Sequence, residues 1–493
     1  MGANATVGTF IAVVVAHIMV DFMGMSVWPV YKTLAGLDVA KAGWIATVIG
    51  MSGTALQPVF GLIADRFGPR RVILLGALLT SFASLLGPLA DYQSALDRRL
   101  PTLFGLSGFY LVVFVILAAG RLGQDMFHPS GAGLAGSFSA RRGSMFLAVF
   151  IAVGSIGFGL SQIVFRTAYN NLGHHTEILL IPAAILWAFV WLRCRPAEVP
   201  YSERISVIGS LHALRPVAGQ ILVLFLILAI SSGVLTGLFF LMPEFAHEKG
   251  YPAWIGQGGA FGLIVFGSTV FMVPMGHLAD RIGRRRTLIA MMILSAISYH
   301  AIVRLTLPVP AFVLLCIVGG AFLGTVNPLG VAFGQRIAPP KNMSIVSAVL
   351  MGWAWCLGST APSIVGELYQ HLGHNASKTL VLLGAANVVM VMIGFLLPKV
   401  TDSTKNRKNG AGPGDKLQKT RIDDQRDSGK MRKSESAGGL TLHAMRGNIK
   451  NKYRMIFYDS CQFSVDIQDR LVLCFLHEKA IPYQKNQISE STS

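Results

Sequence analysis

The chain has 493 residues, of which 53% are hydrophobic and only 13% are charged, and its formal net charge at pH 7 is +18. Soluble proteins carry roughly 25% charged residues, so this composition excludes an ordinary water-soluble protein and indicates a polytopic membrane protein. The positive charge does not indicate nucleic-acid binding, because no basic cluster is interleaved with aromatic side chains that could stack on bases.

Twelve apolar segments are long enough to cross a bilayer, since a spanning helix needs about 20 mostly apolar residues. Six are predicted near residues 8–30, 42–63, 72–90, 105–128, 144–165 and 177–193. Six more are predicted near residues 217–241, 253–275, 287–305, 309–331, 345–367 and 378–397. We therefore predict an all-α membrane protein with an N-terminal six-helix bundle (1–193), a cytoplasmic connector (194–216) and a C-terminal six-helix bundle (217–398).

The remaining residues, 399–493, differ in composition. Between Lys405 and Lys452 the chain is rich in Lys, Arg, Asp, Ser and Gly and poor in large apolar side chains, which is typical of disorder. We expect a basic, largely disordered cytoplasmic tail.

The charge of the short loops predicts the orientation. Loops on the side that includes residues 66–71 and 281–286 hold about twice as many Lys and Arg residues as loops on the other side. By the positive-inside rule, we expect a multi-pass cell-membrane protein with both termini in the cytoplasm.

A charged motif occurs once in each half of the apolar chain. The first copy runs from Gly61 to Arg71 (GLIADRFGPRR) and the second from Gly276 to Arg286 (GHLADRIGRRR). An ordinary basic loop would account for the arginines, but not for the repeated Ala-Asp-Arg with its flanking glycines. The repeat therefore indicates internal duplication, which is common among transporters.

This repeated motif resembles the signature loop of the major facilitator superfamily, and the resemblance covers roughly residues 8–398. It implies two pseudo-symmetric six-helix bundles that rock around a site at the membrane midplane. It also implies that the two motif loops form cytoplasmic gates, through Gly61, Asp65, Arg66, Gly68, Arg70 and Arg71 and through Gly276, Asp280, Arg281, Gly283, Arg284 and Arg285.

The resemblance suggests how such a gate works. Asp65 is expected against the start of the eleventh span near Ser344, where free N–H groups favour an anion, and Gly61 is expected to permit close packing. By pseudo-symmetry, Asp280 is expected to face the start of the fifth span near Ser144.

Ionisable side chains inside the predicted spans form two groups. His17 and Asp21 share one face of the first span, and Arg121, Asp125 and His128 share one face of the fourth. A charge at mid-bilayer costs about 2.5–3.5 kcal/mol, so such residues usually face a cavity or a partner and mark function. The corresponding positions of the second half are uncharged, so we expect proton handling in the first half.

We predict that Asp21 carries a proton and that Arg121 and Asp125 set its environment. Two alternatives are open. Arg121 and Asp125 can form a purely architectural ion pair, and His128, which precedes Pro129, can simply cap a kinked helix end.

Two further stretches resemble superfamily motifs. Gly120–Gln124 is similar to a fourth-span motif whose Arg is tied to proton coupling, although Asp125 stands where that motif has Gly. In the fifth span, Gly154, Gly157 and Gly159 are similar to the glycine motif of drug/proton antiporters but lack its Gly-Pro pair. Small residues also allow close helix packing whatever the function.

The His17–Asp21, Gln57-Pro58 and Phe127–Pro129 segments together look most like the fosmidomycin-resistance group of bacterial exporters. This likeness implies proton-coupled export of a small organic compound, such as an anionic or phosphonate-like antibiotic. One alternative is a proton-coupled importer of a carboxylate or other metabolite. A second is a non-conducting, transporter-like sensor or scaffold that signals through the tail.

An enzyme is not expected, because no nucleophile–base pair and no metal-ligand spacing is visible. The five cysteines form neither a disulfide framework nor a zinc motif, so no cofactor and no metal is predicted. The expected partners are a small-molecule substrate, protons and the lipid bilayer, with no nucleic acid, and the expected state is a monomer.

Overall fold

A computed structural model describes residues 3–138, 143–195, 214–338 and 346–398, which lie in one compact unit, Met1–Thr401. The predicted tail and most of the predicted connector lie outside the described residues. In the described part of the chain, 12 helical segments are long and apolar enough to cross a membrane, and each overlaps one predicted span. The all-helical, twelve-span prediction is confirmed.

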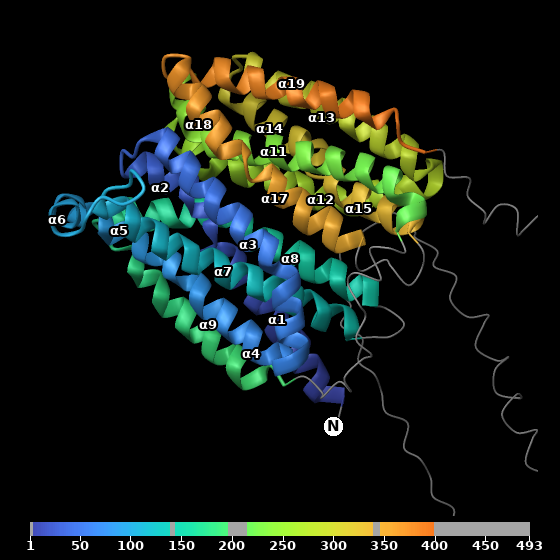
Figure 1. Cartoon of the computed structure of the whole chain (residues 1–493), viewed down its shortest axis with the longest axis horizontal. Helices are drawn as coiled ribbons and strands as arrows, with labels where there is room; N and C mark the ends of the chain where they lie inside the picture. Colours follow the sequence, from blue (N-terminus) through green and yellow to red (C-terminus); the bar gives the residue numbers. More distant parts are fainter. Residues whose placement is uncertain (1–2, 139–142, 196–213, 339–345, 399–493) are drawn as a thin grey trace, which may run out of the picture. The chain divides into compact units, whose positions relative to one another are not determined.

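The first six spans, between Val7 and Arg193, are called the N-terminal half (Figure 1). Several spans are broken into shorter helices by 3-10 turns, for example at Met25–Val27 in the first span. The helices are α1 (Ala3–Met23), α2 (Trp28–Leu34), α3 (Val39–Phe67), α4 (Pro69–Thr80), α5 (Leu86–Leu89), α6 (Gln93–Arg99), α7 (Gly108–Ser137), α8 (Gly143–Asn171) and α9 (Leu180–Arg193).

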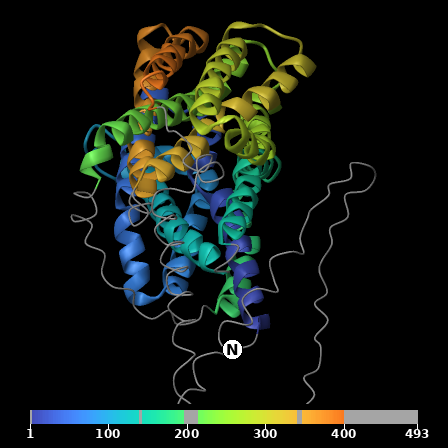
Figure 2. The ribbon, with the colours of Figure 1, turned by 90° about the vertical axis from the view of Figure 1, so that its right-hand side faces the viewer.

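The last six spans, between Arg215 and Gly394, are called the C-terminal half. A quarter turn of the view keeps the helices of the two halves in separate groups (Figure 2). The helices are α11 (Ala218–Glu248), α12 (Ala260–Ile282), α13 (Arg284–Arg304), α14 (Val309–Leu323), α15 (Val326–Ile337), α17 (Ala354–Gly358), α18 (Ala361–His371) and α19 (Ala376–Gly394).

The second glycine of each charged motif ends one span and begins the next. Gly68 separates α3 from α4 with φ 88° and ψ 135°, and Gly283 separates α12 from α13 with φ 99° and ψ 132°. A side chain disfavours positive φ, so glycine suits both turns. The two motif copies therefore share a backbone conformation as well as a sequence.

Several span boundaries differ from the predicted ones, among them the ends of the third and fourth spans. The third span continues through α5 and α6 to Arg99, and Asp97 of α6 accepts a hydrogen bond from the backbone N–H of Phe109 (2.8 Å), which ties this end of the span to the start of α7. Helix α7 continues through Pro129 to Ser137, so His128 lies inside a helix and does not cap its end.

The two halves are joined mainly at the end of the bundle away from the motif loops, which we call the closed end. There Asp38 accepts a hydrogen bond from Gln370 (2.8 Å), and Trp44 donates one to Glu367 (2.7 Å). Buried Trp28 and Tyr31 of the N-terminal half belong to the same apolar cluster as Phe240 and Val365 of the C-terminal half.

Candidate functional site: a buried acid–imidazole cluster

The carboxylate of Asp21 on α1 lies between two imidazoles. Its Oδ2 is 3.1 Å from Nε2 of His17, one turn earlier on α1, and its Oδ1 is 3.0 Å from Nε2 of His128 on α7. Gln124, also on α7, donates a hydrogen bond to Oδ1 (3.2 Å). The side chains of His17 and Asp21 are only 5% and 11% exposed, whereas that of His128 is 29% exposed.

The partners of His17 imply where a proton must sit. Nδ1 of His17 is 2.7 Å from the backbone oxygen of Phe150, and because a carbonyl oxygen can only accept, Nδ1 carries a hydrogen. A neutral His17 would then turn the lone pair of Nε2 toward an oxygen of Asp21. These two acceptors tolerate a 3.1 Å separation only if one proton lies between them, on the imidazole or on the carboxyl group.

Helix α8 holds the His17 ring in place. The ring stacks on Phe150, with centroids 3.9 Å apart and planes 15° from parallel. A Cβ at Gly154 would overlap the same ring, and a Cβ at Gly157 would overlap the backbone oxygen of Ile18. These two glycines therefore let α8 lie directly against α1.

Gly159, the third glycine of the fifth-span group, faces the other half of the molecule. A Cβ there would lie 3.4 Å from Val265 of α12, an ordinary contact distance.

Arg121 and Asp125 form a second, adjacent group on α7. Nε of Arg121 is 2.6 Å from Oδ2 of Asp125, whose side chain is 1% exposed. From α3, Gln57 donates to Oδ1 of Asp125 (2.7 Å), and Thr54 accepts a hydrogen bond from the Arg121 guanidinium. A Cβ at Gly53 would overlap the Asp125 carboxylate, so this glycine makes room for the pair.

This second group lies beside the C-terminal half. A Cβ at Gly352 would be 3.9 Å from Oε1 of Gln57. One turn further along, the thiol of Cys356 is 3.4 Å from the backbone oxygen of Met51. The Arg121 side chain is 20% exposed, so part of it is accessible to water.

The five predicted residues lie in these two neighbouring groups, but Arg121, Asp125 and His128, which were predicted to share one face of the fourth span, are divided between them. His128 turns toward α1 and bonds Asp21, while Arg121 and Asp125 turn toward α3. Side chains on one face of α7 therefore belong to different groups, because their partners lie on two different neighbouring helices, α1 and α3.

The three side chains of His17, Asp21 and His128 are also of types that bind a divalent metal, and their donor atoms lie within 4.8 Å of one another. The sequence did not suggest this, since His128 is far from the other two along the chain. Both N···O distances are those of direct hydrogen bonds, which a shared proton explains without an ion.

At the motif loops, Asp280 pairs with Arg284 of its own loop (3.1 Å), and its side chain is 63% exposed. Arg70 donates a hydrogen bond to the backbone oxygen of Trp191, near the end of α9. Arg285 donates one to the backbone oxygen of Leu397, just beyond the end of α19. The side chains of Asp65, Arg66 and Ser144 and the whole of Ser344 lie outside the described residues, so the expected gate contacts stay predictions.

The first glycine of each motif has open space around it. A Cβ at Gly61 or Gly276 would meet no described atom within 4 Å; the residues near Ser344, where Gly61 is expected to pack, lie outside the described residues, so that close packing stays a prediction. Arg281 is exposed beside the second loop.

Sequence reasoning missed a buried ion pair between the halves. Lys32 of α2 is 0% exposed, and its ammonium contacts the carboxylate of Glu244 on α11 at 2.5 Å and lies 4.7 Å from the centre of the Phe240 ring. Thr33 donates to the same carboxylate oxygen (3.0 Å). The sequence does show one charged residue at the end of each of the two apolar spans. It does not show that these two residues, 212 positions apart, contact each other.

The region of the C-terminal half that corresponds to the ionisable residues of the first and fourth spans is polar and uncharged. Asn327 donates to Ser231 (3.3 Å), and Thr325 and Thr236 bond backbone oxygens. The ionisable side chains of the acid–imidazole cluster and of the Arg121–Asp125 pair, in contrast, all belong to the N-terminal half.

Comparison with known proteins gives a consistent result. Residues 9–271 and 257–448 match the family model described as Major Facilitator Superfamily. A crystal structure of a variant of the nucleoside transporter NupG superposes with a TM-score of 0.62 at 13% identity, covering 80% of this chain and 100% of that one.

Three curated proteins are similar at low identity. The multidrug efflux pump Tap of Mycolicibacterium fortuitum is 23% identical, over 72% of this chain and 88% of that protein. The fosmidomycin resistance protein of Escherichia coli is 21% identical, over 75% and 88%. A probable 4-methylmuconolactone transporter of Cupriavidus pinatubonensis is 25% identical, over 76% and 83%.

Proposed function

Because this chain belongs to the Major Facilitator Superfamily, we propose that it is a secondary active transporter that exports a small organic compound in exchange for protons. The observation that carries the proposal is the His17–Asp21 contact, whose geometry requires a proton between Nε2 and Oδ2. Two of the similar proteins are named for drug efflux or antibiotic resistance, which favours export of a toxic compound.

In this proposal the cluster holds the transported proton and His128 connects it to water. Asp21 and His17 are nearly enclosed, and His128 is the most exposed member of the cluster. A proton reaching Nε2 of His128 can pass to Oδ1 of Asp21 across the 3.0 Å contact. The driving force is the membrane potential, which supplies about 2.3 kcal/mol per charge per 100 mV.

Arg121 is the proposed contact for an anionic part of the substrate. Its guanidinium is permanently charged, and the side chain is partly exposed. The Asp125 carboxylate contacts only the Nε atom of this guanidinium. A carboxylate or phosphonate that approaches from the space between the halves can therefore meet the remaining N–H donors.

The closed end suggests which state this conformation represents. The Lys32–Glu244, Asp38–Gln370 and Trp44–Glu367 contacts join the halves away from the motif loops. If the motif loops lie in the cytoplasm of a cell membrane, as the loop charges predict, this is an inward-facing state. The motif loops, including Asp65, would then gate the cytoplasmic side.

The test of proton coupling compares Asp21→Asn with a matched control. A growth screen of an expressing strain against a panel of toxic small molecules identifies a substrate, which is then loaded into proteoliposomes. Asp21→Asn should abolish flux driven by a pH gradient but retain substrate exchange without a gradient. The control Asp91→Asn changes a 53%-exposed carboxylate at a loop and should behave as wild type. Unchanged gradient-driven flux in Asp21→Asn would show that Asp21 is not the carrier.

The proton and metal interpretations of the cluster predict different responses to chelation. Treating wild-type proteoliposomes with EDTA inside and outside should leave gradient-driven flux unchanged. Loss of flux that is restored by a divalent ion would assign the cluster to a metal.

Two other functions remain to be separated from export. Proton-coupled import of a metabolite is favoured by the similar protein named as a muconolactone transporter, and the direction of net flux in oriented vesicles decides between them. A non-conducting sensor would depend on the tail. Deleting residues 403–493 should preserve flux in a transporter and abolish the cellular effect of a sensor.

A further inference from the structure

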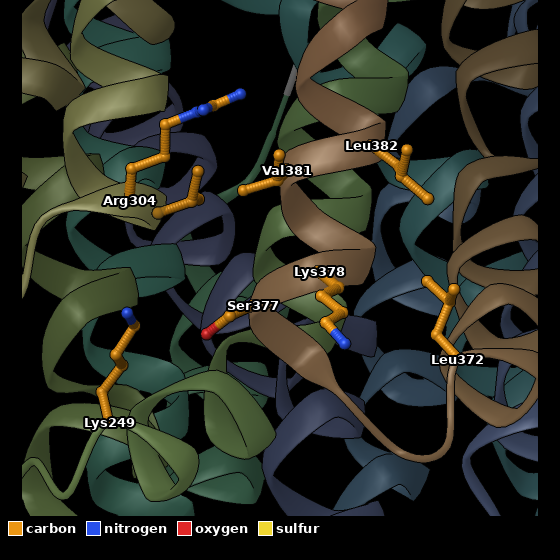
Figure 3. A pocket seen from close by; sticks show the side chains of 8 residues that line it. Lys249, Arg304, Leu372, Ser377, Lys378, Val381 and Leu382 are labelled. Carbon is orange, nitrogen blue, oxygen red and sulfur yellow. The ribbon is translucent and has the colours of Figure 1, made fainter.

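A cavity of about 560 Å³ opens at the closed end of the C-terminal half, where the ends of three spans meet (Figure 3). Lys249 follows the last residue of α11, Arg304 is the last residue of α13, and Ser377 and Lys378 stand in the first turn of α19. Four apolar side chains complete its lining: Val303, Leu372, Val381 and Leu382.

The three cations around this cavity have no carboxylate within 4 Å in the described part of the chain. Lys249 donates to the hydroxyl of Thr306 at 3.3 Å and lies 5.8 Å from the centre of the Phe245 ring. The loop charges place this end on the less basic side of the membrane, where positive residues are least expected. Three cations therefore gather here beside one acid, Glu248, whose carboxylate accepts the backbone N–H of Ser377, and the excess positive charge favours an anionic partner.

A buried hydroxyl in the wall also lacks a partner. Oγ of Ser377 is enclosed and makes no hydrogen bond with any described residue. In Figure 3 this oxygen points from α19 toward the side of the cavity where Lys249 lies. The backbone N–H of Ser377 is already bonded to Glu248 (3.1 Å), and that of Lys378 to Asn375 (2.7 Å), so side chains rather than the helix end are free to bind a ligand.

The apolar part of the lining continues onto the outer surface of the bundle. Leu382 is 51% exposed and Leu305, beside Arg304, is 48% exposed. In a membrane protein such side chains face lipid tails. The cavity thus combines an anion-binding rim with an apolar surface that runs along α19.

We propose that this cavity binds the headgroup phosphate of an anionic phospholipid. Lys249 and Ser377 contact the phosphate oxygens, Arg304 and Lys378 add positive charge at the rim, and an acyl chain lies along Val381 and Leu382. Isolated Lys and Arg residues at helix ends commonly extend to the lipid interface without binding a particular lipid. Three cations from three spans around one cavity distinguish this site from that ordinary arrangement.

The test measures lipid retention by the full-length protein in detergent, using native mass spectrometry. Dihexanoyl phosphatidylglycerol, dihexanoyl phosphatidylcholine and inorganic phosphate are titrated separately. Phosphatidylglycerol should bind, and the Lys249→Gln/Arg304→Gln double variant should bind it about tenfold more weakly, because each cation near a membrane surface contributes to the attraction. Lys249→Arg should retain binding.

Arg98→Gln is the matched control, since Arg98 is an exposed cation of α6 at the same end but away from the cavity. It should bind phosphatidylglycerol as wild type does. Equal weakening in Arg98→Gln, equal binding of phosphatidylcholine, binding of inorganic phosphate alone, or no weakening in the double variant would each overturn the proposal.

Discussion

The ammonium of Lys32 and the carboxylate of Glu244 form an ion pair that joins the two halves of the protein at its closed end. Lys32 is completely buried, and the side chain of Glu244 is 12% exposed. Opening this end must separate the two groups, so the stability of the pair contributes directly to the equilibrium between conformations.

Removing one partner of this pair should be more harmful than removing both. Lys32→Gln leaves the Glu244 carboxylate without its cation, and loss of one member of a buried pair typically costs about 3–5 kcal/mol. Lys32→Gln/Glu244→Gln should unfold at a higher temperature in detergent than either single variant. Additive destabilisation in the double variant would show that the two charges are not coupled.

Gly53→Ala should disturb the Arg121–Asp125 pair. The new Cβ would overlap the Asp125 carboxylate, so we expect substrate flux to fall by at least tenfold. Gly133→Ala is the control, because a Cβ at Gly133, on α7, meets nothing within 4 Å and alanine favours a helix by about 1 kcal/mol over glycine. Equal flux in the two variants would argue against a role for the pair's geometry.

His128→Gln should reduce proton-driven flux, because His128 is the exposed link to Asp21. His174→Gln provides the comparison. His174 also contacts an aspartate, Asp91, at 2.7 Å, but both side chains are exposed at the closed end. We expect His128→Gln to lose about tenfold or more of the gradient-driven rate and His174→Gln to lose none. If both variants keep full gradient-driven flux, protons reach Asp21 by another route.

Cys194, just beyond the end of α9, should react slowly with alkylating reagents. Burial raises the pKa of its thiol to about 11, against the opposing effect of the nearby Arg70 charge. Only the thiolate reacts, so in a variant whose other four cysteines are serine, the iodoacetamide rate should rise about tenfold per pH unit between pH 7 and 10. Fast labelling at pH 7 in the folded protein would contradict this account.

Much of the architecture follows from local signals in the sequence. Apolar segment length was enough to place the spans, and the repeated motif predicted the duplication that Gly68 and Gly283 display in their backbone angles. The helical spacing of His17 and Asp21 correctly placed the two side chains in contact.

The division of the site into two groups could not be predicted in this way. It depends on which neighbouring helix each side chain of α7 meets, and that depends on close approaches at residues without side chains, such as Gly53 and Gly154. A search for charged residues passes over Gly53, and the glycines recognised in the fifth span did not reveal that Gly154 lies against the His17 ring. For the same reason, neither the Phe150 carbonyl that orients His17 nor the pairing of Lys32 with Glu244 was visible.

The short 3-10 turn at Met25–Val27 divides the first span into two parts. One part carries His17 and Asp21 of the acid–imidazole cluster, and the other carries Lys32 of the ion pair with Glu244. Asp21 and Lys32 therefore lie on two separate helices, α1 and α2, rather than on one continuous helix. Gln162 of α8 anchors the turn through the backbone oxygen of Ser26 (2.8 Å), and Ser26 in turn bonds the backbone oxygen of Asp21. A change of angle at this turn would move Asp21 relative to Lys32, so the turn links the two buried groups mechanically.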